Sequence, residues 1–269
     1  MLRYAGFRAT NTVRPKSRAA GVGLCAIALG EEAYIDEWIR YHLALGVDHI
    51  HLYDNDPEQP LRDVPARYPG RVTVVSFPGA AQQFKAYNHF LARARSRYLW
   101  VTFLDLDEFM VVRSGESIGD FAQQYCSAGA LALNWVMFDS NGHEQFQSRP
   151  VLERFTRRQI GVSPIIKIIA RPDDVLYMVS AHAARLVRGT TVDCHGNEVF
   201  GNLNPNGSDD VACVNHYFTK SREEFRIRCA RGRSDIDATR NADRDFINFG
   251  AHSWHDRRAW DFYQLHVDQ

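Results

Sequence analysis

Two aspartates separated by one residue follow a short apolar run near the middle of the chain. Asp105 and Asp107 come directly after residues 100–104, Trp-Val-Thr-Phe-Leu. Carboxylate oxygens are hard ligands that suit Mg²⁺ or Mn²⁺, and such a cation can neutralise the charge of a departing diphosphate. If the apolar run is a buried strand, both carboxylates can reach one cation as the chain leaves the sheet. A solvated acidic turn is the alternative interpretation of so short a motif.

A haloacid-dehalogenase-type phosphatase also has two aspartates after a strand. Its motif has Thr or Val two residues after the second aspartate, and it usually lies on the first strand. Phe109 stands at that position here, and we expect at least two strands before Asp105. The sequence therefore disfavours this phosphatase.

The elements that position the aspartates are predicted from apolar periodicity. Helical spacing predicts helices over residues 31–45 and 82–95, and a helical, Arg-rich region from residue 221 onward. Strands are predicted at residues 21–29, 47–53, 71–77, 98–104, 130–138, 165–170 and 175–180. This alternation is typical of an α/β fold with a mostly parallel sheet flanked by helices. Ligands bind such sheets at the carboxyl ends of strands, where Asp54 and Asp105–Asp107 are expected.

Length and charge exclude several classes of protein. The chain has 269 residues, of which 45% are hydrophobic, and 32 basic residues balance 32 acidic ones. The length suits one large globular domain, or one domain with an appendage. A net charge of zero argues against a general nucleic-acid binder, which usually carries a basic excess.

Apolar runs and cysteines predict a cytoplasmic protein without a membrane span. The longest apolar stretches, residues 22–29 and 128–138, are shorter than the roughly 20 residues that a spanning helix needs, and no signal-peptide core is visible. Five scattered cysteines without a CxxC pattern predict reduced thiols. Residues 1–20 are basic and predict a flexible tail. The alternative is a patch that associates peripherally with the anionic inner face of a membrane.

Seven blocks of residues extend from residue 22 to about residue 235. They are Glu31–Trp38 with Tyr41, His42 and Gly46; Tyr53–Asn55; Gln83 with Ala86–Asn88; Trp100 with Asp105–Phe109; Trp135 and Phe138 with Ser140–His143; Lys167 with Arg171, Pro172 and His182; and Asn215–Tyr217 with Lys220, Ser221, Glu223–Phe225, Arg231 and Gly232. Their order and spacing resemble GT-A glycosyltransferases of family 92 and bacterial family-2-like relatives. Gly30-Glu31-Glu32 departs from the Lys-Asn-Glu that the family often carries, which affects the expected contacts of the first loop.

The resemblance implies a GT-A fold, which is Rossmann-like, and a hexosyltransferase activity. The donor would be a nucleotide diphosphate sugar, UDP-linked, and the acceptor a glycan or lipid-linked molecule. The transfer would require Mn²⁺ or Mg²⁺ and invert the sugar. We assign residues 21–220 to this domain, with a nucleotide-binding half at about 21–110 and an acceptor half at about 111–220. Residues 221–269 would form a helical C-terminal extension.

The resemblance also assigns the metal and donor residues. Asp105 and Asp107 would bind the metal and donor, and His216 would complete the metal shell, since a neutral imidazole suits Mn²⁺. His182 is the rival histidine, and Glu108 would support the metal loop. Further donor contacts are predicted for Asp54, Lys85, Lys220 and Arg231. For each of these, an ordinary turn or surface residue is the alternative.

Base and acceptor residues are predicted after residue 130. Trp135 and the loop residues Asn141, Gly142 and His143 would line the pocket for the sugar and acceptor, with a core tryptophan and a plain turn as alternatives. Glu153 is the predicted catalytic base because it follows this loop. Its alternative is an ion pair with Arg157 on a helix surface. Asp139 and Glu144 are the substitutes for this role.

Two other functions stay open at this point. A sugar nucleotidyltransferase would carry a basic, Gly-rich phosphate loop near its first strand, and residues 21–24, Gly-Val-Gly-Leu, lack that charge. A non-catalytic sugar-nucleotide-binding module in polysaccharide assembly would keep Asp105 and Asp107 but tolerate loss of the base. Donor hydrolysis or transfer would separate such a module from an enzyme.

Overall fold

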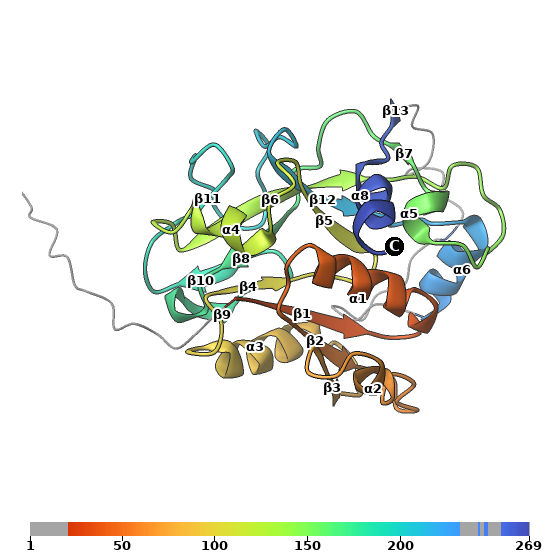
Figure 1. Cartoon of the computed structure of the whole chain (residues 1–269), viewed down its shortest axis with the longest axis horizontal. Helices are drawn as coiled ribbons and strands as arrows, with labels where there is room; N and C mark the ends of the chain where they lie inside the picture. Colours follow the sequence, from red (N-terminus) through yellow and green to blue (C-terminus); the bar gives the residue numbers. More distant parts are fainter. Residues whose placement is uncertain (1–20, 232–241, 243–244, 247–253, 269) are drawn as a thin grey trace, which may run out of the picture.

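The computed structural model describes residues 21–231, 242, 245–246 and 254–268 (Figure 1). The large sheet contains β1 (Val22–Ala28), β2 (His49–Asp54), β3 (Val72–Ser76), β4 (Trp100–Phe103), β5 (Glu108–Val112), β6 (Ala130–Met137), β8 (Ile166–Ala170), β11 (Thr191–Val192) and β12 (Ala212–His216). Two small sheets pair β9 (Val175–Met178) with β10 (Ala184–Leu186) and β7 (Arg157–Arg158) with β13 (Trp254–His255). The helices are α1 (Ile35–Ala44), α2 (Val64–Arg67), α3 (Gln83–Ala94), α4 (Ile118–Gln123), α5 (Val151–Arg154), α6 (Arg222–Arg231) and α8 (Arg258–His266), with 3₁₀ turns η1 (Glu32–Tyr34) and η2 (Pro172–Asp174).

The strand order of the large sheet is β3-β2-β1-β4-β8-β6-β12-β5, with β11 beside β6. β1 pairs in parallel with both β2 and β4, and β2 pairs in parallel with β3. β8 is antiparallel to β4 and β6, whereas β12 is parallel to β6 and antiparallel to β5. The α/β class and the mostly parallel, Rossmann-like sheet predicted from the sequence are therefore confirmed.

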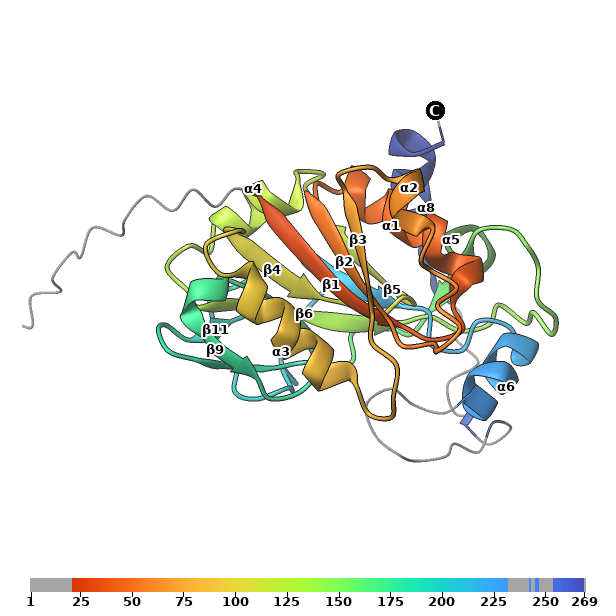
Figure 2. The ribbon, with the colours of Figure 1, turned by 90° about the horizontal axis from the view of Figure 1, so that it is seen from below.

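The two faces of the sheet carry separate cores. Every residue of β1 is buried, and its side chains alternate between the faces as those of a strand must. Leu24 packs in the same core as Trp38 of α1, and Cys25 packs in the core that contains Tyr87 and Phe90 of α3. Figure 2 shows α1 and α3 on opposite sides of the strands. The strand ends are thereby held rigidly, with their loops at the edge of the sheet.

The predicted helices and parallel strands agree with the structure, but two strands differ from the expectation. No element was predicted for residues 108–112 or 212–216, which form β5 and β12 in the structure. β5 and β12 pair in antiparallel register, with His216 opposite Glu108. This pairing brings the two segments together although residues 113–211 lie between them in the sequence.

The structure describes only part of the two terminal regions for which predictions were made. The predicted basic tail lies outside the described residues, and the described part of the C-terminal extension includes α6 and α8. All five cysteines are free thiols. Within the described part of the chain, no helix has the length and apolar character needed to cross a membrane.

Candidate active site

The two aspartates leave the carboxyl end of β4 in different environments. Asp105 is partly exposed, whereas Asp107 is buried and lies immediately before β5. The loop between them is fixed by its backbone, because the Asp105 carbonyl accepts the Glu108 N–H and the Asp107 carbonyl accepts the Tyr217 N–H. The structure therefore places the predicted pair at the ligand-binding edge of the sheet.

Asp105 belongs to a buried polar cluster beneath the edge. Its Oδ1 accepts hydrogen bonds from Gln83 Nε2 (2.7 Å) and the Tyr87 hydroxyl (3.2 Å), both on α3. Its Oδ2 lies 3.3 Å from Lys167 Nζ, which is also 3.1 Å from Glu108 Oε2. Burial disfavours the Lys167 ammonium, but the two carboxylates outweigh it and raise its pKa. Burial raises the pKa of Glu108 well above its usual value, and Lys167 opposes this shift.

Asp107 lies between a histidine and an arginine from later in the chain. Its Oδ2 is 3.3 Å from His216 Nε2, at the end of β12, and contacts Arg228 Nη1 from α6. Burial opposes ionisation of Asp107, but the Arg228 guanidinium and the contact with His216 lower its pKa well below the usual range. Burial lowers the pKa of His216, against the effect of Asp107. The pair is therefore an ionised carboxylate beside a neutral imidazole at neutral pH.

Trp135 packs against both histidines that were predicted as rivals. Its ring centroid lies 4.2 Å from that of His216 and 5.0 Å from that of His182, which meets it edge-on at 83°. His182 Nδ1 lies 2.9 Å from the Ile166 carbonyl, and burial lowers the pKa of this histidine to about 4. His216 lies 3.3 Å from Asp107, whereas His182 contacts the Ile166 carbonyl and the Trp135 ring. This arrangement favours His216 over His182 as a partner of Asp107.

Lys220 places a buried ammonium beside the same cluster. It adopts a positive φ of 51° directly before α6. That helix begins with a capping box, since the Ser221 hydroxyl accepts the Glu224 N–H and the Glu224 carboxylate accepts the Ser221 N–H. The Lys220 Nζ lies 4.6 Å from the centroid of the Tyr34 ring. Burial lowers its pKa, and within the described residues it has no carboxylate partner within 4 Å. A buried cation of this kind is suited to an anionic ligand.

The donor set around Asp107 fits a divalent cation that also binds phosphate. Among the residues that the structure describes, no three His, Cys, Asp or Glu side chains converge on one point. Asp107 Oδ1 and both ring nitrogens of His216 are nevertheless buried without a hydrogen-bond partner in that part of the chain. Mg²⁺ is often held by one or two protein ligands together with substrate phosphates. Asp107 and His216 meet this requirement.

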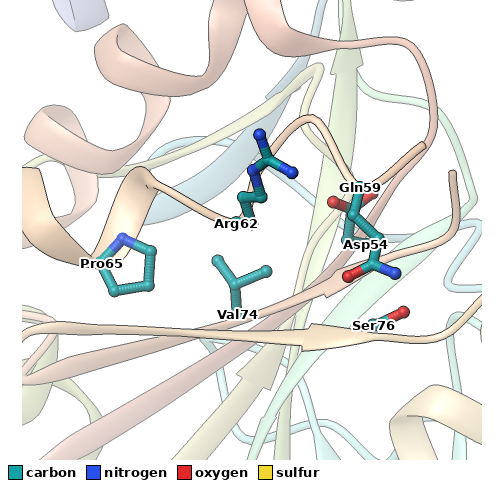
Figure 3. A pocket seen from close by; sticks show the side chains of 6 residues that line it. All are labelled: Asp54, Gln59, Arg62, Pro65, Val74 and Ser76. Atoms are coloured by element: carbon teal, nitrogen blue, oxygen red, sulfur yellow. The ribbon is translucent and has the colours of Figure 1, made fainter. Parts of the chain in front are cut away.

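Asp54 lies at the same edge of the sheet, two strands from β4. It lines a small pocket with Gln59, Arg62, Pro65, Val74 and Ser76, between β3 and the segment that follows β2 (Figure 3). Its two carboxylate oxygens accept the backbone N–H groups of Asp56 and Leu61. Burial raises the pKa of Asp54. In this structure the side chain thus shapes the turn, and its contact with a donor stays a prediction.

Lys85 and Arg231, the other predicted donor contacts, have different surroundings. Lys85 is exposed on α3. Arg231 Nη1 donates to the carbonyls of Leu29 and Gly30, and its Nη2 lies 3.3 Å from Glu31 Oε1. Arg231 therefore ties the end of α6 to the loop after β1. Its predicted phosphate contact remains untested.

The predicted base and acceptor residues lie in a second group around α5. Glu153 pairs with Arg149 at 2.8 Å, not with Arg157 as the alternative reading expected. Arg157 instead lies 3.3 Å from the buried Asp139, whose Oδ1 also accepts the Asn141 N–H. In the same loop, Asn141 Oδ1 accepts the Arg157 N–H, the His143 ring packs edge-on against Phe155, and Glu144 forms an ion pair with Arg222. Gly142 is exposed and has a φ of 79°.

Sequence reasoning missed the roles of Lys167, Arg228 and the α3 pair Gln83 and Tyr87. Three of these lay in quoted blocks without an assigned role, and Arg228 lay in a mixed-charge run that resembled a solvated helix. A buried lysine in an otherwise apolar strand was the available signal for Lys167, since an unpaired charge there would be costly. No comparable signal distinguished Arg228.

The fold and the charged cluster together define a class. A Rossmann-like sheet with carboxylates, an imidazole and basic side chains at the carboxyl ends of its strands is typical of enzymes that bind phosphorylated ligands. Comparison with known families makes this specific, because residues 20–228 match the sequence model of Glycosyltransferase family 92. The chain belongs to this family.

Two plant proteins illustrate the relationship. A glycosyltransferase family 92 protein of Oryza sativa subsp. japonica is 26% identical over 166 residues, which are 59% of this chain and 28% of that protein. One from Arabidopsis thaliana is 26% identical over 242 residues, 82% of this chain and 40% of that protein. The chain therefore spans less than half the length of these relatives.

Comparison with solved structures gives only distant matches. HddC from Yersinia pseudotuberculosis has a TM-score of 0.37 and 9% identity, with coverage of 57% of this chain and 77% of that chain. The 4-diphosphocytidyl-2C-methyl-D-erythritol synthase from Anaerococcus prevotii has a TM-score of 0.32 and 12% identity, with coverage of 57% and 70%.

Proposed function

We propose that this chain has a GT-A fold and transfers a hexose, with inversion, from a UDP-linked donor to a glycan or lipid-linked acceptor. The observation that carries the proposal is the cluster at the carboxyl end of β4. It combines ionised Asp107, neutral His216, the buried cation Lys220 and the partly buried Arg228. Carboxylate and imidazole suit Mn²⁺ or Mg²⁺, and the basic side chains suit a diphosphate.

Each residue has a distinct task in this proposal. Asp107 and His216 would hold the cation, which supplies charge stabilisation for the leaving diphosphate. Lys220, a buried cation near Asp107, would contact the phosphate oxygens. Asp105, oriented by Gln83, Tyr87 and Lys167, keeps a partly exposed carboxylate toward the donor. Because these contacts preset the side chains, little reorganisation is needed on binding.

The general base is proposed among Glu153, Asp139 and Glu144. An inverting transfer needs a carboxylate to accept the proton of the attacking hydroxyl. In the structure these three carboxylates pair with Arg149, Arg157 and Arg222 respectively. The acting residue would therefore have to exchange its arginine for the acceptor hydroxyl.

Binding of nucleotides tests the donor site. We expect one nucleoside diphosphate from a panel of UDP, GDP, CDP, dTDP and ADP to raise the melting temperature by about 5 °C at saturation. The rise should require Mn²⁺ or Mg²⁺. The corresponding sugar nucleotides should then be hydrolysed or transferred. If no nucleotide shifts the melting temperature with either metal, the proposed donor site is wrong.

Replacing Lys220 by methionine tests the buried ammonium. We expect the diphosphate affinity to fall about tenfold, because one charge-assisted contact is lost. Stability should not fall comparably, because methionine keeps much of the stem and needs no counter-ion. Isothermal titration and urea unfolding measure the two effects. Arg97→Met, before β4 at the opposite edge of the sheet, is the control for binding. An unchanged affinity in Lys220→Met would exclude this contact.

A non-catalytic sugar-nucleotide-binding module is the second candidate. Every predicted base is paired with an arginine, and this pairing favours a module that lacks a working base. It predicts metal-dependent binding of the nucleotide sugar without release of nucleotide over hours. Measurable turnover would exclude it.

A further inference from the structure

The carboxylate oxygen of Asp107 that faces His216 is also in contact with a positively charged side chain. Both His216 Nε2 and Arg228 Nη1 approach Oδ2, whereas Oδ1 is buried without a hydrogen-bond partner within the described residues. A guanidinium on this oxygen neutralises a carboxylate that is almost fully buried. In the absence of a cation, Arg228 thus supplies the charge that the carboxylate needs.

A divalent cation at Asp107 and His216 would compete with this guanidinium. A cation held by Asp107 and His216 would lie beside the guanidinium on Oδ2, and two positive groups at one buried carboxylate repel each other. Cation binding would therefore favour withdrawal of Arg228. Metal binding is therefore linked to the position of one side chain on α6.

Arg228 can withdraw without unfolding its helix. The start of α6 is fixed by the Ser221–Glu224 capping box and by the buried pair of Arg154 with Glu224 at 2.9 Å. The guanidinium itself lies 4.5 Å from the Phe218 ring and donates to the Phe218 carbonyl at 3.2 Å. Withdrawal of the guanidinium would break these two contacts with Phe218, but it would leave the contacts at the first turn of the helix in place.

The diphosphate that binds with the cation can form hydrogen bonds with the displaced guanidinium. A diphosphate carries two or more negative charges, and arginine binds phosphate oxygens through paired N–H groups. Lys220, on the chain segment just before the same helix, is the neighbouring cation. A diphosphate beside Asp107 would thus find two basic side chains from one short segment.

We propose that Arg228 is a donor-positioning residue that moves from Asp107 to the diphosphate when the cation binds. The inference rests on the proposed function of this site. It makes metal and nucleotide binding mutually supportive, because each removes the obstacle to the other, and such coupling is reciprocal. Metal alone therefore binds weakly, and the metal with a nucleoside diphosphate binds strongly.

The variant Arg228→Gln should change the affinities for Mn²⁺ and for the diphosphate in opposite directions. We expect Mn²⁺ alone to bind about tenfold more tightly, because its competitor is gone, and the nucleoside diphosphate that gave the largest thermal shift to bind about tenfold more weakly in saturating Mn²⁺. Isothermal titration measures both constants on the full chain. Arg226→Gln, an exposed arginine on the same helix, is the matched control and should change neither. Arg228→Lys should change both constants less than Arg228→Gln.

Three outcomes overturn the exchange. They are weaker Mn²⁺ binding in Arg228→Gln, unchanged Mn²⁺ binding, or unchanged diphosphate binding. A melting temperature recorded for each variant separates these results from loss of the fold, and Arg228→Lys replaces the glutamine variant if the latter unfolds. If the wild-type chain binds no nucleotide with Mn²⁺, the proposed function fails first. If wild type binds the nucleotide but Arg228→Gln does not combine tighter Mn²⁺ binding with weaker diphosphate binding, the proposed donor site stands and the proposed role of Arg228 is wrong.

Discussion

Replacing Asp107 by asparagine should lower the rate of sugar transfer about 10³-fold. Asparagine keeps the volume and one carbonyl oxygen, but it removes the charge proposed to hold the cation beside His216. Loss of one preorganised electrostatic partner of a developing charge costs about 10²- to 10³-fold, and loss of metal affinity adds to this. The initial rate of donor hydrolysis or transfer at saturating donor measures the effect.

Two controls for Asp107→Asn test whether the variant is folded and whether the effect is specific to this carboxylate. Asparagine leaves Arg228 with a neutral partner, so we expect a lower melting temperature, and the assay must be run where the variant is folded. Asp173→Asn changes an exposed carboxylate in η2, which follows the antiparallel β8 at the opposite edge of the sheet. It should turn over at the wild-type rate. A folded Asp107→Asn variant with wild-type turnover would remove Asp107 from the proposed chemistry.

The parallel half of the fold was predictable because each element carries its own local signal. β1 and β4 are short apolar runs, and α1 and α3 show helical spacing between turns. β5 and β12 were not predicted because their pairing partners are distant in sequence. Their residues also follow charged or polar segments that favour a loop reading. Strand formation there depends on burial between neighbouring strands, which periodicity does not report.

The same distinction applies to the site. Asp105 and Asp107 were identified because two carboxylates after an apolar strand form a local pattern. His216 was assigned through the family resemblance, and the register of β12 with β5 explains why it reaches Asp107. Lys167 reaches Asp105 because antiparallel β8 lies between β4 and β6. Sequence spacing could not show this insertion.

Replacing Lys167 by methionine should lower the free energy of unfolding by about 3–5 kcal/mol at pH 7. The ammonium is fully buried and lies between Asp105 Oδ2 and Glu108 Oε2. Removing one partner of a buried ionic cluster leaves the others uncompensated, which typically costs this amount. Urea unfolding measures the change. Lys85→Met, at an exposed position of α3, should stay within about 0.5 kcal/mol of wild type.

The destabilisation of Lys167→Met should grow as the pH rises. Without the ammonium, the pKa of Glu108, already raised by burial, rises further. A carboxyl whose pKa is higher in the folded than in the unfolded state stabilises the fold while it is protonated, and that stability is lost as the pH increases above about 4.3, the unfolded value. The Lys167 pKa is itself raised, so wild type keeps its ammonium throughout this range. The gap in unfolding free energy should therefore be wider at pH 8 than at pH 5. A gap independent of pH would show that Lys167 acts by packing and not by neutralising Glu108.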